Sequence, residues 1–365
     1  MPVTTLPFGT APDGRPAHLY LLSNGHGMVV GATDLGACLV SCRVPDGEGR
    51  LPDVLLGYDS AAGYADNLMA FGGTVGRVAN RIGGASFELG GTTYGLSANL
   101  AGSCLHGGRD MWFQRRWKAG VGAPSAGASS VTFSLLSPDG DQGFPGDLDV
   151  RVTYALDDED RLSLHYLALP SAPTLVNLCC HAYWNLNGHA SGDVRGHSLQ
   201  VEAGRYTVTD KDLVPTGELA PVEGTPLDLR RPRRIGDCLA GVPGGLDHNF
   251  ALDARCGAGG AAGAPAPTDG GPGRPELTAT LVGERSRIRL RVLTTAPGLQ
   301  VFTAGGLCER HGKDGAAYGP SAGVALETQL FPDAIHHPGF PAATDPVFGP
   351  GRPFESETQF CFDLA

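Results

Sequence analysis

Apolar and polar residues alternate with a period of two along several stretches of the chain. In Leu148–Leu156 every second residue is apolar, and Asp149, Arg151 and Thr153 lie between them. The segments Arg161–Leu169 and Ser286–Leu293 repeat this pattern. Such alternation is typical of antiparallel strands with one face on a core and the other in water. We therefore predict half-buried antiparallel strands over these three segments.

Shorter stretches of the same kind predict further strands and leave little of the chain for helices. Helical patterns are confined to Ser60–Asn67 and Arg233–Leu239, and no segment alternates strands with helices as a parallel α/β sheet requires. The predicted fold class is all-β, an antiparallel fold with few short helices. The weaker strand candidates are His18–Leu22, Met28–Ala32, Cys38–Val44, Val131–Leu136, Thr278–Val282, Leu299–Thr303 and Thr358–Phe362.

Composition agrees with many short strands joined by turns. The 365 residues include 55 glycines and 28 prolines, and 41% of the chain is hydrophobic, which is enough for a sizeable core. Large all-β folds often reach this length as one domain, so we expect a single domain over residues 1–365. Gly120–Ser130 and Ala254–Pro275 contain almost no large apolar residue, and we expect them to be flexible loops within that domain.

Charge and cysteine usage exclude several classes of protein. The net charge of −11 argues against a nucleic-acid partner, and the cluster Arg230–Arg234, interrupted by a proline, is interpreted as a solvated turn. The nine cysteines are odd in number and form no C-x-x-C motif, so we expect reduced, buried thiols and no zinc motif. Because neither a signal peptide nor an apolar run of about 18 residues is visible, we expect a cytoplasmic protein that does not span a membrane.

The segment Thr174–Asn187 contains more than a core strand needs. It begins as an apolar strand and then contains His181, Tyr183, Trp184, Asn185 and Asn187, whose side chains are suited to bind a polyhydroxylated ligand and to move protons on it. Glu327 follows an apolar strand in the same way. A carboxyl group at that depth has a pKa raised by desolvation or needs partners, and either is typical of a general base.

Five further candidates lie in glycine-rich loops or at strand ends. They are Asn80 and Arg81, His106, Asp247 and Gln300. The glycine-rich stretch around the first two fits neither the dinucleotide-binding fingerprint nor the P-loop, and an arginine with an amide can grip adjacent sugar hydroxyls. Each candidate alone has an ordinary explanation, such as a surface ion pair, a loop histidine or a turn aspartate. Taken together, they suit proton transfer on a neutral polar ligand.

These residues occur in motifs that resemble the aldose 1-epimerase (galactose mutarotase) family. The similarity runs from about Leu19 to Phe362, and the resemblance implies a large antiparallel β-sandwich, the supersandwich, with a sugar cleft on one sheet. The matching segments, in the order of the family, are Gly76–Ile82, the loop at His106, Asn177–Leu186, Leu246–Phe250, Pro297–Phe302 and Leu326–Gln329.

The resemblance also implies the role of each residue. Glu327 would be the general base and His181 the general acid, with His106 assisting near the ring and anomeric oxygens. The sugar-binding or supporting positions would be Asn80, Arg81, Asp247, Gln300 and Tyr183. The implied ligand is a free aldose such as D-galactose or D-glucose, with no metal and no cofactor, in a monomer or homodimer. Trp184 stands where phenylalanine is common in the family, and we expect it to narrow the cleft.

Other readings of the same residues stay open. A sugar-phosphate epimerase of the same fold should have more basic residues around its cleft, and a non-catalytic carbohydrate-binding protein needs no paired acid and base. A glycoside hydrolase using Asp247 and Glu327 would need two carboxylates flanking the scissile bond. A metal site from His106, His181 and His248 lacks the spacing of metal ligands.

Overall fold

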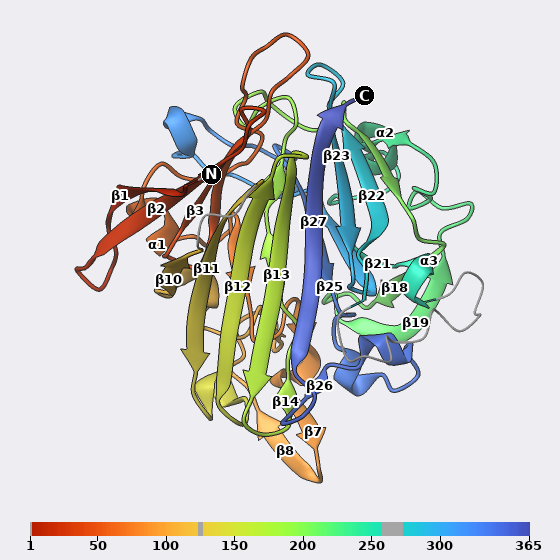
Figure 1. Ribbon diagram of the computed structural model, residues 1–365. Helices are drawn as coiled ribbons and strands as arrows, with labels where there is room; N and C mark the ends of the chain where they lie inside the picture. The colour runs from red at the N-terminus through yellow and green to blue at the C-terminus, as the bar shows by residue number, and fades with distance from the viewer. Residues whose placement is uncertain (1, 123–126, 257–272) are drawn as a thin grey trace.

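The computed structural model describes residues 2–122, 127–256 and 273–365, and within these ranges the backbone is built mainly from antiparallel strands. The largest sheet has nine strands, and Figure 1 shows its long members side by side across the molecule. In spatial order they are β10 (Lys118–Val121), β11 (Ala128–Ser137), β12 (Leu148–Asp157), β13 (Arg161–Pro170), β27 (Phe354–Leu364), β23 (Ile288–Thr294), β22 (Glu276–Val282), β17 (Ser198–Val201) and β20 (Arg233–Arg234).

Two further sheets complete the main architecture. The six-stranded sheet consists of β16 (Tyr183–Trp184), β25 (Val324–Gln329), β24 (Gly298–Phe302), β21 (Asp247–Ala251), β18 (Arg205–Thr209) and β19 (Pro215–Pro221). The four-stranded sheet consists of β1 (Thr4–Thr10), β2 (Pro16–Ser23), β3 (Val29–Thr33) and β4 (Leu39–Arg43).

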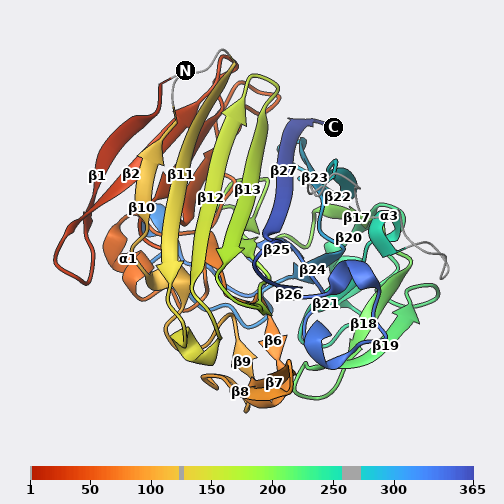
Figure 2. The ribbon, with the colours of Figure 1, turned by 60° about the horizontal axis from the view of Figure 1, so that its bottom comes forward.

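Short elements connect these sheets, and Figure 2 shows β6 to β9 together at one end of the molecule. The two-stranded pairs are β14 (Thr174–Leu175) with β26 (Val347–Phe348), β15 (Cys179–His181) with β5 (Gly73–Val75), β6 (Arg81–Ile82) with β9 (Cys104–Leu105), and β7 (Ser86–Leu89) with β8 (Thr92–Gly95). The α-helices in the described ranges are α1 (Ala61–Ala65), α2 (Ile235–Leu239) and α3 (Asp253–Cys256). Single 3₁₀ turns occupy Gly83–Ala85, Trp112–Gln114, Asp141–Gly143, Lys313–Gly315, Ala334–His336 and Ala342–Thr344.

The core lies between the nine-stranded and six-stranded sheets. Val150 on β12, Leu164 on β13 and Leu290 on β23 are fully buried and belong to the same apolar cluster as Leu299 and Leu326 of the six-stranded sheet. Face-to-face packing of two antiparallel sheets through alternate residues defines a β-sandwich. Burial of these apolar faces is the main favourable contribution to folding. The all-β class and the three strongly patterned strands are confirmed.

The weaker strand candidates also form strands, whereas both loop predictions need correction. In Gly120–Ser130, the first two residues belong to β10 and Ala128–Ser130 belong to β11, because these segments pair as a hairpin at the sheet edge. Residues 123–126 of this stretch lie outside the described ranges. In the second predicted loop, Ala254–Cys256 belong to α3, and residues 257–272 lie outside the described ranges. Among the described residues, no helix is long and apolar enough to cross a membrane.

All nine cysteines fall within the described ranges, and all are free thiols. Seven are buried, as expected, but Cys308 is exposed and Cys361 is half-buried. Cys361 is on the outer face of β27, where alternate residues point to solvent. The expectation of burial is therefore wrong for Cys308 and only partly met for Cys361.

Candidate active site

The second face of the six-stranded sheet carries a row of polar residues. Glu327 on β25 lies directly opposite Gln300 on β24, and Gln300 lies opposite Asn249 on β21. Their neighbours along the strands, such as Leu326 and Val301, are buried in the core between the sheets. Because side chains alternate along a strand, the polar residues must point to the other side. The strand pairing that buries Leu326 and Val301 in the core therefore brings the carboxyl group of Glu327 and the amide of Gln300 together on the opposite face.

A pocket of about 180 Å³ lies over this polar face. It brings together seven of the eight residues predicted for the site, and Gln300 lies directly beside them through its bond to Asp247. The apolar lining includes Met69, Met111 and Phe302, which the sequence did not single out. The predicted residues that line it are Asn80, Arg81, His106, His181, Tyr183, Asp247 and Glu327.

The centre of the pocket is a buried carboxyl–imidazole pair. Oε1 of Glu327 lies 3.5 Å from Nε2 of His181, and the two residues are only 2% and 5% exposed. The other carboxyl oxygen of Glu327, Oε2, accepts a hydrogen bond from the Cys179 thiol at 3.5 Å. Nδ1 of His181 is buried and has no hydrogen-bond partner in the described part of the chain. Such a pair is placed to exchange a proton with a bound ligand.

Burial shifts both pKa values of the pair toward the neutral forms. Desolvation, reinforced by the nearby negative charge of Asp247, raises the pKa of Glu327 to about 8. Desolvation lowers the pKa of His181 to about 4. Between these two values the pair holds one proton, which in the empty site is on Glu327. The two groups are close enough to titrate as one unit.

The orientation of His106 is fixed by an unusual backbone turn. Asn80 and His106 both have positive φ angles, 61° and 51°, which non-glycine residues rarely adopt. The backbone N–H of His106 donates to the Asn80 carbonyl oxygen at 2.9 Å, and the Asn80 N–H donates to Nδ1 of His106 at 3.2 Å. Burial and the adjacent His181 lower the pKa of His106 well below its usual value. The ring is therefore neutral and carries its proton on Nε2, as a hydrogen-bond donor to a ligand.

Two polar pairs line the walls of the pocket. The side-chain oxygen of Asn80 accepts from the backbone N–H of Arg81 at 2.8 Å and from its guanidinium at 3.3 Å. Gln300 donates from Nε2 to Oδ1 of Asp247 at 2.5 Å, which fixes that carboxylate beside Glu327. These bonds leave donors of Arg81 and an oxygen of Asp247 available to sugar hydroxyls.

The prediction that Trp184 narrows the cleft is wrong. Tyr183 and Trp184 are consecutive in β16, so they point to opposite faces, and only Tyr183 lines the pocket. Trp184 is fully buried in the core, with its ring 5.0 Å from that of Phe360. The amide of Asn185 is likewise structural, because it donates to the carbonyl oxygens of Gly192 and Ala322.

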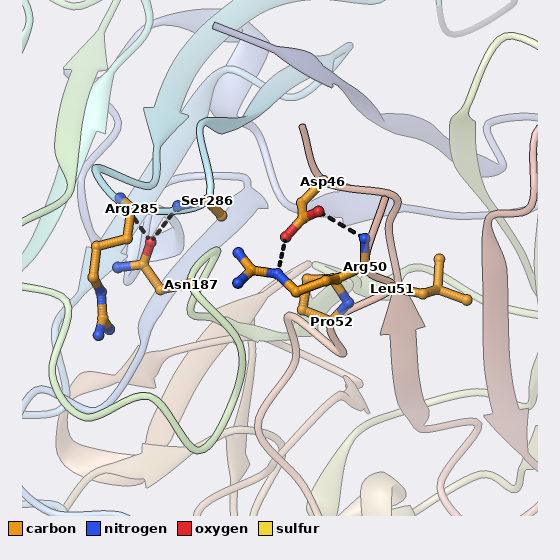
Figure 3. Close-up of a pocket in the computed structure, with 7 residues that line it drawn as sticks. All are labelled: Asp46, Arg50, Leu51, Pro52, Asn187, Arg285 and Ser286. Atoms are coloured by element: carbon orange, nitrogen blue, oxygen red, sulfur yellow. Dashed lines mark hydrogen bonds and ion pairs between the residues drawn. The ribbon is translucent and has the colours of Figure 1, made fainter. Parts of the chain in front are cut away.

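Asn187 lies at a different pocket, shown in Figure 3. Its side-chain oxygen accepts from the backbone N–H groups of Arg285 and Ser286, and its amide donates to Glu284. On the other side of this pocket Arg50 is bound to Asp46. The polar groups here bond with one another, so Asn187 acts as a structural residue.

His248 also lies away from the proposed pair. Its Nδ1 accepts from the Asp247 backbone N–H, and its ring packs 6.0 Å from that of Tyr206. Asp247 and His248 are adjacent on β21 and point to opposite faces, so His248 cannot join His106 and His181 around one metal ion. In the described ranges there is no group of three or more His, Cys, Asp or Glu side chains arranged to hold a metal.

The fold and the site together define a class of protein: an acid–base enzyme on an antiparallel β-sandwich, with a pocket for a small polar ligand. Comparison with known proteins gives the same answer. The sequence model of the family described as aldose 1-epimerase matches residues 18–361. The chain belongs to the aldose 1-epimerase family, whose members are isomerases.

Individual relatives match over nearly their whole length. A galactose mutarotase of Homo sapiens is 36% identical over all of this chain and 99% of its own. An aldose 1-epimerase of Escherichia coli (strain K12) is 36% identical over 96% and 97% of the two chains. Among solved structures, an aldose epimerase homologue from C. elegans has a TM-score of 0.82 at 26% identity, covering 96% and 99%. A galactose 1-epimerase from Lactobacillus acidophilus NCFM has a TM-score of 0.80 at 26% identity, covering 100% and 99%.

Proposed function

We propose that this enzyme interconverts the α and β anomers of free hexoses such as D-galactose and D-glucose. The observation that carries the proposal is the buried pair of Glu327 and His181, 3.5 Å apart in a pocket of about 180 Å³. The names of the two relatives at 36% identity agree with it. The same comparisons support a single domain.

The proposed chemistry is a pair of proton transfers. The Glu327 carboxylate takes the proton of the C1 hydroxyl, the bond between C1 and the ring oxygen breaks, and C1 becomes an aldehyde. The ring oxygen takes a proton from His181, so no charged intermediate forms. After rotation about the C1–C2 bond the ring oxygen attacks the other face of C1, and both protons return. Each positioned acid or base contributes about 10²–10⁴-fold to the rate.

This cycle requires one proton in the Glu327–His181 pair. Burial places that proton on Glu327 in the empty site. Ring opening uses the alternative arrangement, with the proton on His181. This arrangement forms when the proton moves from Oε1 of Glu327 to Nε2 of His181, which lie 3.5 Å apart. Sugar hydroxyls that donate to the carboxylate, together with the positive charge of Arg81, favour this arrangement. Ring opening then returns the pair to its resting state.

The remaining residues are proposed to bind and orient the sugar. Nε2–H of His106 is suited to donate to the ring or anomeric oxygen. Arg81, which is held by Asn80, offers hydrogen-bond donors to vicinal sugar hydroxyls. Asp247, which is held by Gln300, offers an acceptor to them. Tyr183, whose ring lies 4.9 Å from that of His181, forms one wall. All steps are proton transfers by the chain's own side chains, so we propose no metal and no cofactor.

The rival functions fit this pocket less well. The phosphate group of a sugar phosphate would lie near the carboxyl groups of Asp247 and Glu327. Among the described residues that line the pocket, Arg81 is the one arginine or lysine that could balance its charge. The arginine cluster around Arg230 lines a separate pocket. A glycoside hydrolase would need Asp247 as a free acid, base or nucleophile, whereas Oδ1 of Asp247 is bound by the amide of Gln300. We retain cytoplasmic location, and a monomer or homodimer, as proposals.

The direct test is polarimetry of freshly dissolved α-D-galactose and α-D-glucose. We expect the purified protein to accelerate the change in optical rotation well above the spontaneous rate, and the ratio of the two rates ranks the sugars. If a folded protein accelerated neither reaction, the assignment to free hexoses would be wrong. Sugar phosphates would then be the next substrates to measure.

Replacing Arg81 with alanine is expected to raise KM for galactose more than it lowers kcat. The guanidinium lies at the pocket wall and exchanges no proton in the proposed reaction, so its loss mainly removes binding shared by the ground and transition states. The smaller fall in kcat comes from the loss of its positive charge near Glu327. Steady-state polarimetry over a range of galactose concentrations measures both constants. Arg151→Ala, on the outer face of β12, is the matched control. A fall in kcat with unchanged KM would contradict the binding role.

A further inference from the structure

Cys179 contacts Glu327 in a way that the proposed proton transfers do not use. The two oxygens of the carboxyl group are held differently: Oε1 lies by His181 Nε2, and Oε2 accepts from the Cys179 thiol. Cys179 is fully buried and does not line the pocket. It therefore contacts Glu327 from the side away from the ligand.

The position of Cys179 follows from the strand that carries His181. Both residues belong to β15, two positions apart, so their side chains lie on the same face. The intervening Cys180 points the other way, where its thiol donates to the Gly72 carbonyl oxygen at 3.6 Å within the core. One short strand thus places the acid and a hydrogen-bond donor on the same carboxyl group.

The thiol remains a donor throughout the working range of the enzyme. Burial, together with the negative charge of Glu327, raises the pKa of Cys179 well above its usual value. A thiol is a weaker donor than the hydroxyl of serine or threonine. It can therefore fix the rotation of the carboxyl group while stabilising the carboxylate charge only slightly.

We propose that Cys179 is a positioning residue, whose thiol turns Glu327 so that Oε1 faces His181 and the anomeric hydroxyl, and whose weak donation lets the pair keep its single proton. The proposal rests on the proposed epimerase function. The titratable groups that face Glu327 are Asp247 on β21, Arg81 on β6, His181 and Cys179 on β15, and Tyr183 on β16. Cys179 is the member of this set whose donor strength can be changed with little change in charge or shape.

Serine and alanine at position 179 are expected to move the pH profile in opposite directions. Cys179→Ser supplies a stronger donor, stabilises the carboxylate and should lower the alkaline limit of kcat/KM by roughly one pH unit. Cys179→Ala removes the donor, should raise that limit, and should lower kcat about tenfold because the carboxyl group is free to rotate. KM should change little in both variants, since residue 179 lies outside the pocket.

Cys180→Ala is the matched control, because it removes the neighbouring buried thiol without touching Glu327. It should leave the pH limits in place, and thermal unfolding of each variant reports any loss of stability. If Cys179→Ala and Cys179→Ser kept the wild-type limits, or moved them as Cys180→Ala does, the positioning role would be overturned.

A readout without substrate separates this proposal from the function on which it rests. The infrared absorption of a protonated carboxyl group, assigned to Glu327 by its loss in Glu327→Gln, can be followed against pH in the sugar-free protein. The midpoint should shift down in Cys179→Ser and up in Cys179→Ala. Such shifts in a protein that is inactive on free hexoses would uphold the contact and refute the proposed substrate. Unshifted midpoints in an enzyme that is active on free hexoses would uphold the proposed substrate and refute the positioning role of Cys179.

Discussion

Glu327→Gln is expected to lower kcat for galactose mutarotation by about 10³- to 10⁴-fold, at the upper end of what one positioned base contributes. Glutamine keeps the shape of the side chain and can still accept from Cys179, but its amide does not take the C1 proton. KM should change by much less, because the sugar still meets Arg81, Asp247 and His106. Polarimetry under saturating and subsaturating galactose separates the two effects.

The control is Glu357→Gln on β27, a glutamate on the outer face of the nine-stranded sheet. It should leave kcat and KM unchanged. A Glu327→Gln variant that folds normally and retains more than roughly a tenth of the wild-type kcat would be incompatible with Glu327 as the base.

The pH dependence of kcat/KM in the wild-type enzyme is an independent test of the Glu327–His181 pair. The active state holds one proton, so kcat/KM should form a bell with limits near 4 and near 8, the values to which burial shifts His181 and Glu327. Activity falls above the upper limit because the pair loses its only proton, and below the lower limit because both groups are protonated. If Glu327 acted as a simple base without sharing a proton with His181, activity would instead rise through the upper value.

The sequence was informative where alternation alone decides the outcome. The period of two placed Val150, Leu164 and Leu290 in the core and marked His181 and Glu327 as polar interruptions of apolar strands, and the structure agrees. The same rule, applied strictly, would have placed Trp184 in the core, because it is adjacent to Tyr183. It would also have grouped Cys179 with His181. Both signals lie in the local sequence.

Other features of the site had no local signal. The bond between Cys179 and Glu327 joins residues 148 positions apart, and it depends on how β15 approaches β25. The contact between Asn80 and His106 needs two left-handed backbone conformations that only the packed loops maintain. Alternation predicts which way a side chain points, but distances across strands follow from register and loop packing, which the motifs do not encode.

His181→Ala is expected to lower kcat by about 10²- to 10⁴-fold, since the ring oxygen then leaves without its proton donor. The neighbouring His106 can donate a hydrogen bond from Nε2 but cannot supply an extra proton, because burial lowers its pKa well below the usual value and its Nδ1 already accepts from the Asn80 backbone N–H. KM should be less affected. The comparison variant is His165→Ala, which removes a histidine from the outer face of β13 and should leave the kinetics intact.

Rescue by added imidazole distinguishes proton transfer from a packing role. The alanine variant leaves space at the centre of the pocket where a free imidazole can bind beside Glu327, and a bound molecule can again supply the proton to the ring oxygen. Imidazole also accelerates mutarotation in solution, so the rate without enzyme is subtracted at each concentration. We expect saturable recovery of kcat in His181→Ala and none in Glu327→Gln. Equal recovery in both variants would show that imidazole acts generally and does not take the place of the His181 side chain. A folded His181→Ala variant that keeps more than roughly a tenth of the wild-type kcat would show that His181 does not act as the acid.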